Sequence, residues 1–172
     1  SSGSSNDTTL DRRLADTLSK ALVFHGIIDV LPNQRVIGSG SGDWARLGAD
    51  YGVIGRYSVN KDQINMEIRL FDAADDKMLM GKAYKGPLDE QDQMIYKFTD
   101  AAINELTGKP GLATTQIAFV TPPSDKRERE VFLTDILGRK MRQVTRHRNL
   151  VVSPRFSPDG TYLAYTSYHS GN

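Results

Sequence analysis

Four leucines near the start of the chain recur at helical spacing: Leu10, Leu14, Leu18 and Leu22. Charged residues fill many of the positions between them, so the segment is apolar on one side only. A stripe of this period predicts an amphipathic helix that lays one face on a core. We expect Asp7 or Thr8 to cap its start and Gly26 to end it.

The pattern after this helix changes to a short strand and a loop. The almost wholly apolar run 27–31 predicts a buried strand. Residues 38–42 read GSGSG and predict a flexible loop. Asp43 can then cap a short helix over residues 44–47.

Three segments with strand character follow: residues 51–59, 63–72 and 77–85. In the middle segment every second residue is apolar: Ile64, Met66, Ile68 and Leu70. Such alternation predicts a strand with one buried and one solvated face. The short turns NKD and AADD between the segments predict an antiparallel meander.

Apolar residues return to helical spacing after Pro87: Ile95, Phe98, Ala102 and Leu106. Gly108 and Pro110 predict the end of this second long helix. The fold class expected for residues 8–110 is therefore α/β (α+β), with two long helices on a small mixed sheet. Residues 1–7 are expected to be a flexible lead-in.

From residue 116 onward the pattern predicts short strands alone, after a linker at 111–115. The predicted strands are 116–120, 130–136, 140–145 and 162–166. Four such strands make one antiparallel sheet, so residues 116–172 are expected to form about one blade of an incomplete β-propeller. A lone blade leaves faces and edges uncovered, which could let two chains pair into an oligomer.

Composition sets limits rather than a function. The 172 residues are 38% hydrophobic and 25% charged, which is typical of a globular chain. A formal net charge of +1 gives no global attraction for nucleic acid or an anionic membrane. The absence of cysteine excludes disulfides, zinc-thiolate sites and thiol nucleophiles.

Glycines in the loop could be taken for a phosphate-binding loop, because Gly38, Gly40 and Gly42 precede a short helix. However, Asp43 would repel phosphate, and no Lys-Ser or Lys-Thr pair follows the glycines. We interpret this segment as a surface loop.

The chain has three histidines: His25, His147 and His169. They are far apart in the sequence, without metal-ligand or triad spacing. We expect His25 at the end of the first helix, where a cation suits the dipole. Asp72, Asp75 and Asp76 fall in a predicted hairpin turn, where aspartate usually serves turn geometry rather than calcium. The sequence predicts no catalytic, cofactor or metal site.

The most basic stretch contains six residues: Arg139, Lys140, Arg142, Arg146, His147 and Arg148. It could face nucleic acid or an acidic protein, but alternating strand positions and the mixed charges of 126–130 favour a solvated surface. Trp44 and four tyrosines are predicted to be mostly core residues rather than a stacking surface. The tyrosines are Tyr51, Tyr57, Tyr162 and Tyr165.

The segment SPRFSPDGTYLAYTS, residues 153–167, resembles the repeat that marks each blade of the TolB family and of related WD40-like propellers. The core of this blade motif is Phe156, Ser157, Pro158, Asp159 and Gly160. We expect a tight turn over 158–160. Phe156, Leu163 and Tyr165 are expected to project into the space between blades.

Two further segments favour the TolB family over other propellers. LTGKPGLATTQIAFV, residues 106–120, resembles the family's junction between the N-terminal domain and the first blade. LGADYGVIGRY, residues 47–57, resembles the N-terminal domain. The resemblance spans nearly the whole chain from the first helix onward.

This resemblance implies a non-enzymatic periplasmic adaptor of the Tol-Pal system that maintains cell-envelope integrity and supports cell division. The implied partners are a Pal-like lipoprotein and a TolA-like inner-membrane protein, without nucleic acid, cofactor or direct membrane insertion. In the family a strand and a TolA-engaging segment precede the first helix, and further blades follow. No partner-contact residue is therefore carried over to this chain, and no signal peptide is present in it.

Two alternatives stay open. An α/β domain of the curli-assembly or outer-membrane lipoprotein type shares the helix and strand pattern, although it lacks the blade motif. A peptidase with an N-terminal propeller shares the blade motif. It would carry a GxSxG serine beyond residue 172.

Overall fold

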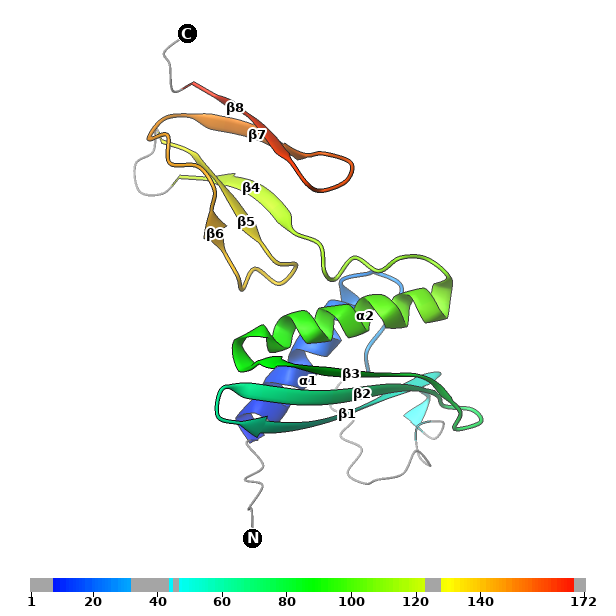
Figure 1. The fold of residues 1–172 in the computed structure, drawn as a ribbon. Coiled ribbons are helices and arrows are strands. Elements are labelled where there is room, and N and C mark those ends of the chain that lie inside the picture. The colour runs from blue at the N-terminus through cyan, green and yellow to red at the C-terminus, as the bar shows by residue number, and fades with distance from the viewer. Residues whose placement is uncertain (1–7, 32–43, 45–46, 123–127, 169–172) are drawn as a thin grey trace. The chain divides into compact units, whose positions relative to one another are not determined.

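The computed structural model describes residues 8–31, 44, 47–122 and 128–168. The chain divides into two compact units, Ser1–Thr114 and Thr115–Asn172, which Figure 1 shows. The helices of the first unit are α1 (Thr8–Val23), the short 3₁₀ helix η2 (Leu88–Glu90) and α2 (Gln91–Thr107). Its strands are β1 (Tyr51–Asn60), β2 (Gln63–Asp72) and β3 (Met78–Pro87). The strands of the second unit are β4 (Ile117–Thr121), β5 (Glu130–Thr134), β6 (Arg142–Gln143), β7 (Val151–Phe156) and β8 (Leu163–Ser167).

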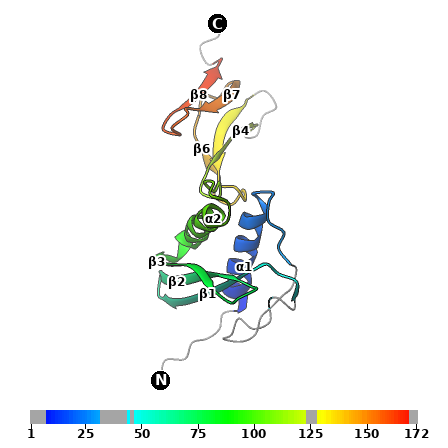
Figure 2. The ribbon, with the colours of Figure 1, turned by 90° about the vertical axis from the view of Figure 1, so that its right-hand side faces the viewer.

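The first unit has two layers, with α1 and α2 on the same face of the sheet (Figures 1 and 2). The strand order is β1-β2-β3, and both pairs are antiparallel. Consecutive strands joined by tight hairpins necessarily run antiparallel. The predicted meander is thus confirmed, and the prediction of a mixed sheet is wrong for the described residues.

The core of the first unit lies between β2 and the helices. The alternating residues of β2 are all buried: Ile64, Met66, Ile68 and Leu70. They pack in one cluster with Ile95, Phe98 and Ala102 of α2 and with Leu14 of α1. The helical and strand periods of the sequence therefore predict this core correctly.

Both long helices end as their glycines predict. Gly108 takes the left-handed conformation (φ 69°), and its N–H donates to the Asn104 carbonyl at 2.8 Å. Gly26 also has a positive φ of 69° and donates to the Val23 carbonyl at 2.9 Å. Residues without a side chain adopt this conformation without strain, so each helix stops there.

The predicted strand over 27–31 is wrong. These residues follow α1 without strand structure, and Ile27 is 60% exposed. An apolar run becomes a buried strand only if another strand is available to pair with it. The described sheet ends at β1 and β3 and does not include this run.

Trp44 is a core residue, as predicted. It is 5% exposed and packs against Phe71, with 5.5 Å between the ring centroids. Its ring lies directly over Gly52, where an added Cβ would meet three ring atoms at 2.1 to 2.3 Å. The predicted glycine loop, Asp43 and residues 45–46 of the predicted helix over 44–47 lie outside the described residues.

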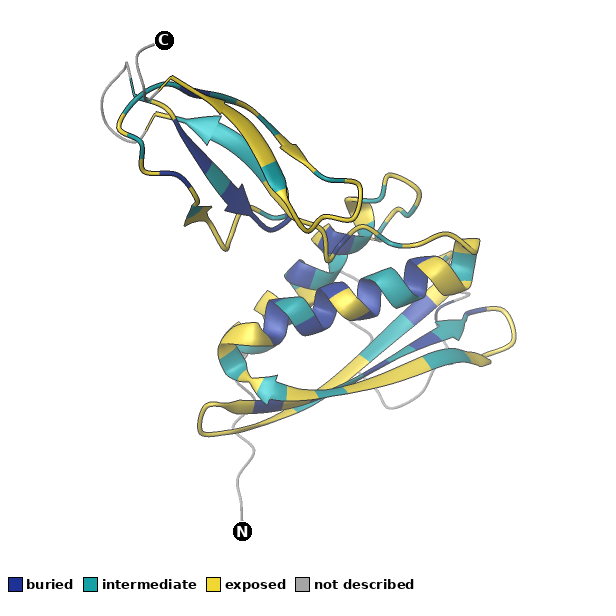
Figure 3. Ribbon diagram, turned by 45° about the horizontal axis from the view of Figure 1, so that its top comes forward, coloured by how far each residue is buried: buried dark blue, intermediate teal, exposed yellow. Residues whose placement is uncertain are grey.

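Among the described residues, the second unit contains no four-stranded sheet. Its strands form a three-stranded antiparallel sheet, β4-β5-β6, and a separate hairpin, β7-β8. β5 is the most buried strand, as Figure 3 shows. The predicted third strand over 140–145 shrinks to the two residues of β6. The single-sheet prediction is therefore wrong.

β7 is a strand that the sequence pattern does not predict, because it contains Pro154. The chain accommodates this proline by an irregular register between Val152 and Arg155. Ser153 has a φ of 56° within this irregularity. A local distortion of this kind lets a strand contain a residue that cannot donate to the ladder.

The predicted burial of the tyrosines fails for three of the four. Tyr162 is 73% exposed, and Tyr51 and Tyr165 are also exposed, whereas Tyr57 is half-buried. Tyr162 precedes β8 in a loop, and Tyr51 begins the edge strand β1, so neither is enclosed on both sides.

Within the described residues, no helix combines the length and apolar character needed to cross a bilayer.

Candidate functional site

The first unit ends in a short segment that is bound to α2 and to His25, just after α1. We call residues 109–114 the exit strap, because the chain passes from α2 through them toward residue 115. His25 lies just beyond the end of α1, as predicted, and its side chain is only 4% exposed. Its Nδ1 lies 2.9 Å from the Ala21 carbonyl, and its Nε2 accepts a hydrogen bond from the Leu112 N–H at 2.8 Å.

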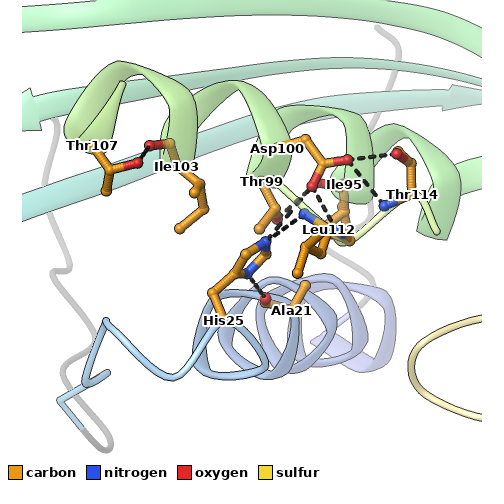
Figure 4. Close-up of polar contacts among 10 residues, drawn as sticks. Ala21, His25, Ile95, Thr99, Asp100, Ile103, Thr107, Leu112 and Thr114 are labelled. Atoms are coloured by element: carbon orange, nitrogen blue, oxygen red, sulfur yellow. Dashed lines mark hydrogen bonds and ion pairs between the residues drawn. The ribbon is translucent and has the colours of Figure 1, made fainter. Parts of the chain in front are cut away.

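Asp100 of α2 binds the end of the exit strap (Figure 4). Its carboxylate accepts hydrogen bonds from the Ala113 N–H at 2.6 Å and from the Thr114 N–H at 3.0 Å. The Thr114 hydroxyl donates to the same carboxylate at 2.5 Å. Three donors on two consecutive residues make this carboxylate a fixed attachment point for the strap.

The strap also lies very close to the backbone of α2. A Cβ added at Gly111 would come within 2.4 Å of the Asp100 Cα, and Ala113 is fully buried. Only glycine allows an approach this close at position 111. The residues 111–114 of the predicted linker are thus packed against the helix rather than separate from it.

The histidine and aspartate in this cluster do not form a catalytic triad. His25 Nε2 lies 3.7 Å from Asp100 Oδ1, and its lone pair is already used by the Leu112 N–H. The nearby hydroxyls of Thr114 and Thr99 donate to Asp100 and to the Ile95 carbonyl. A nucleophile must instead donate to its base, so this geometry supports binding of the strap and not acyl transfer.

The blade motif forms a compact turn between β7 and β8. The Gly160 N–H donates to the Ser157 carbonyl at 2.9 Å, and Gly160 has a φ of 70°. The Asp159 carboxylate accepts from the Ser157 hydroxyl at 2.5 Å and from the Thr161 N–H at 3.1 Å. These hydrogen bonds, chiefly that from Ser157, lower the pKa of Asp159.

The apolar residues of the blade motif are only partly covered in this chain. Phe156 and Tyr165 are each 38% exposed, and Leu163 is half-buried. Tyr165 also places its hydroxyl 3.1 Å from His147 Nε2. The packing of these side chains between blades stays a prediction.

Glu130 is a buried carboxylate, 1% exposed, in the second unit. The Arg148 N–H donates to its Oε1 at 2.7 Å, and the Thr145 hydroxyl donates to its Oε2. Burial opposes its charge, but the hydrogen bonds from Thr145, Arg148 and His147 outweigh burial, so the pKa of Glu130 is lowered. Glu130 thereby fixes the turn over 145–148, in which Arg148 has a φ of 54°.

The basic stretch lies mainly on turns rather than along a strand. Its five lysine and arginine residues are exposed, but only Arg142 belongs to β6. Alternating strand positions therefore do not explain their exposure. The Arg139 N–H donates to Asp135 Oδ1 at 2.7 Å, which is a turn interaction.

The histidines and the hairpin aspartates considered in the sequence form no joint site in the described residues. His25 and His147 belong to different units, and His169 lies outside the described residues. Asp72 and Asp75 accept backbone N–H bonds in their hairpin turn, from Ala74 and Lys77. In the described part of the chain, no group of three or more ligand side chains could hold a metal ion.

Asp100 and Glu130 are important polar residues that sequence reasoning missed. Asp100 occupies the middle of a helix, and Glu130 starts a strand, so each resembles an ordinary surface charge in the sequence. A sequence signal exists for Asp100. Gly111, Ala113 and Thr114 are small residues shortly after the helix ends, which would let the chain fold back onto α2. No local pattern marks Glu130 as buried.

Comparison with known proteins agrees with the fold. TolB of Desulfotalea psychrophila is 55% identical over 159 residues, which are 92% of this chain and 36% of that protein. TolB of Syntrophus aciditrophicus is 38% identical over 132 residues, 76% of this chain and 29% of that protein. This chain belongs to the TolB family. It spans about a third of the length of these TolB proteins, and no family model matches it.

A solved TolB structure has the same fold over most of the chain. The crystal structure of TolB from Acinetobacter baumannii superposes with a TM-score of 0.79 and covers 92% of this chain and 41% of that one. Sequence identity is 23%, so this likeness concerns the fold alone. It agrees with a helix-covered antiparallel sheet followed by a region of short strands.

Proposed function

We propose that the protein containing this chain is a non-enzymatic periplasmic adaptor of the Tol-Pal system. The observation that carries this proposal is the identity with TolB proteins of the Tol-Pal system, 55% over 92% of the chain. The polar clusters of the described residues agree with a binding role, because Asp100 and Glu130 bind backbone segments. The adaptor's role is to maintain envelope integrity and support cell division through binding.

The second unit would begin a β-propeller in the longer protein. Exposed side chains in its strands and loops support this, among them Ile117, Phe156 and Tyr165. Propeller blades cover such side chains with neighbouring blades. Domain limits at 8–110, 111–115 and 116–172 belong to this proposal, and so do the expected partners, a Pal-like lipoprotein and a TolA-like protein.

The proposal is tested by a pulldown with the full-length mature protein. Soluble forms of Pal and TolA are immobilised, and circular dichroism first shows that all three proteins are folded. Retention by both partners is the expected result. Retention by neither would overturn the adaptor proposal and leave a TolB-like architecture alone.

A further inference from the structure

The hydrogen bonds of His25 determine which ring nitrogen carries a proton. The Ala21 carbonyl, 2.9 Å from Nδ1, can only accept, so Nδ1 must carry hydrogen. The Leu112 N–H donates to Nε2, so Nε2 must present its lone pair. Both contacts therefore hold only in the neutral ring with hydrogen on Nδ1.

Protonation would place a second hydrogen on Nε2, directly against the Leu112 N–H. The nearest charged acceptor described is Asp100 Oδ1, 3.7 Å from Nε2. A small rotation of the ring exchanges the first partner for the second, and the attraction to a carboxylate favours this exchange. The observed arrangement fits the neutral ring, and a protonated ring would favour a second arrangement turned toward Asp100.

Other charged groups near the ring do not replace Asp100. On α1, Lys20 is paired with Asp16 at 2.9 Å, and Asp29 is exposed beyond the helix. Lys109 in the exit strap is exposed to solvent. Asp100 on α2 is the carboxylate recorded within ion-pair distance of His25 in the described residues.

We propose that His25 is a proton-sensitive latch on the exit strap, released from Leu112 when its buried imidazole is protonated and turns to Asp100. In the neutral state the strap is attached at two points, to His25 and to Asp100. In the protonated state Leu112 is released, whereas Ala113 and Thr114 stay bound to Asp100. The latch thereby changes how firmly the connection to residue 115 is attached to the first unit.

The test is amide hydrogen exchange by NMR on the full 172-residue chain, measured from about pH 8 to about pH 5, where histidines change charge. Protection factors are used, because they remove the pH dependence of the intrinsic exchange rate. The ring nitrogen shifts of His25, recorded in the same samples, report its tautomer and its titration.

We expect hydrogen on Nδ1 at high pH and a fall of about fivefold or more in Leu112 protection as His25 titrates, the factor for one ordinary hydrogen bond. Ala113 and Thr114 keep their protection. Hydrogen on Nε2 at high pH, an unchanged Leu112 amide, or an equal loss at Leu112, Ala113 and Thr114 would overturn the proposal.

His25→Gln is the matched control, since its amide can donate to Ala21 and accept from Leu112 without titrating. We expect its Leu112 protection to be independent of pH. His25→Ala should lower Leu112 protection at every pH. If His25→Gln kept the pH dependence of the original chain, or His25→Ala left Leu112 protected, His25 would not be the latch. The titration of the original chain stands as a test even if a variant does not fold.

Discussion

At the residue scale, single side chains here depend on backbone groups more than on one another. Asp100, Glu130 and Asp159 each accept from backbone N–H groups of a nearby turn or strap. Backbone groups that leave a helix or strand need such partners if they are buried. These carboxylates therefore determine the course of loops, and residue type alone does not predict their burial or their backbone contacts.

Gly52 tests the packing of Trp44. Gly52→Ala would place a Cβ within 2.1 to 2.3 Å of the indole ring and should displace it. We expect a loss of about 1–3 kcal/mol in unfolding free energy and a red-shifted tryptophan emission, measured by denaturant titration. Gly55→Ala is the matched control in the same strand, because its Cβ would meet nothing within 4 Å. Equal effects of both changes would contradict this account.

The pH dependence of the substitution Glu130→Gln tests the role of the buried carboxylate. Its folded pKa lies below the ordinary value of 4.5, so its charge stabilises the folded state above that value. This contribution is lost as the pH falls through the lower, folded pKa. Glu130→Gln should cost about 1–3 kcal/mol at pH 7 and less at low pH, since the protonated carboxyl is already a neutral acceptor.

Exchange of the Val131 amide measures this loss, because its N–H donates to Thr145 Oγ1, which in turn donates to Glu130. A penalty for Glu130→Gln that stayed constant from pH 7 to low pH would show that charge plays no part. Asp135→Asn removes another carboxylate of the same unit and is the control. It should not alter the pH dependence at Val131.

At the element scale, the spacing of apolar residues predicts the helices and the central strand of the first unit. It fails for strands whose formation depends on pairing with a distant segment. The leucine stripe, the alternation in β2 and the glycines after both helices predict α1, β2 and α2 correctly. The run 27–31 has the composition of a strand but no strand partner, whereas β7 pairs despite Pro154. Pairing depends on distant residues, so the sequence pattern alone does not predict it.

Asp92 tests how α1 is attached to α2. This buried carboxylate, in the first turn of α2, lies 3.5 Å from Arg13 Nη2 and 3.5 Å from the Thr17 hydroxyl. Asp92→Ala should cost about 1–3 kcal/mol, because it removes an acceptor from the buried Thr17 hydroxyl and from the Arg13 guanidinium, and a charge from a helix N-terminus. Chemical denaturation followed by Trp44 emission measures the change.

Asp89→Ala is the comparison for Asp92→Ala. It removes the same charge from an exposed position in η2 and should change stability by less than about 0.5 kcal/mol. If the two substitutions were equally mild, Asp92 would not hold the helices together.

At the scale of the whole molecule, two units of different architecture follow one another in one chain. The pattern of short strands and the blade motif predict a change of architecture near residue 115, and three short segments predict the family correctly. The prediction of a single four-stranded sheet fails, because the unpredicted strand β7 pairs with β8 in a separate hairpin.

We propose in addition that the longer protein, as an adaptor, binds its two partners through coupled interfaces. Isothermal titration of the full-length protein with soluble Pal, in the absence and presence of saturating TolA, tests this claim most directly. The account predicts binding to both, with the Kd for Pal changed by about fivefold or more when TolA is bound. Folded proteins that show no binding to either partner would contradict the adaptor function, and binding to both with an unchanged Kd would contradict the coupling.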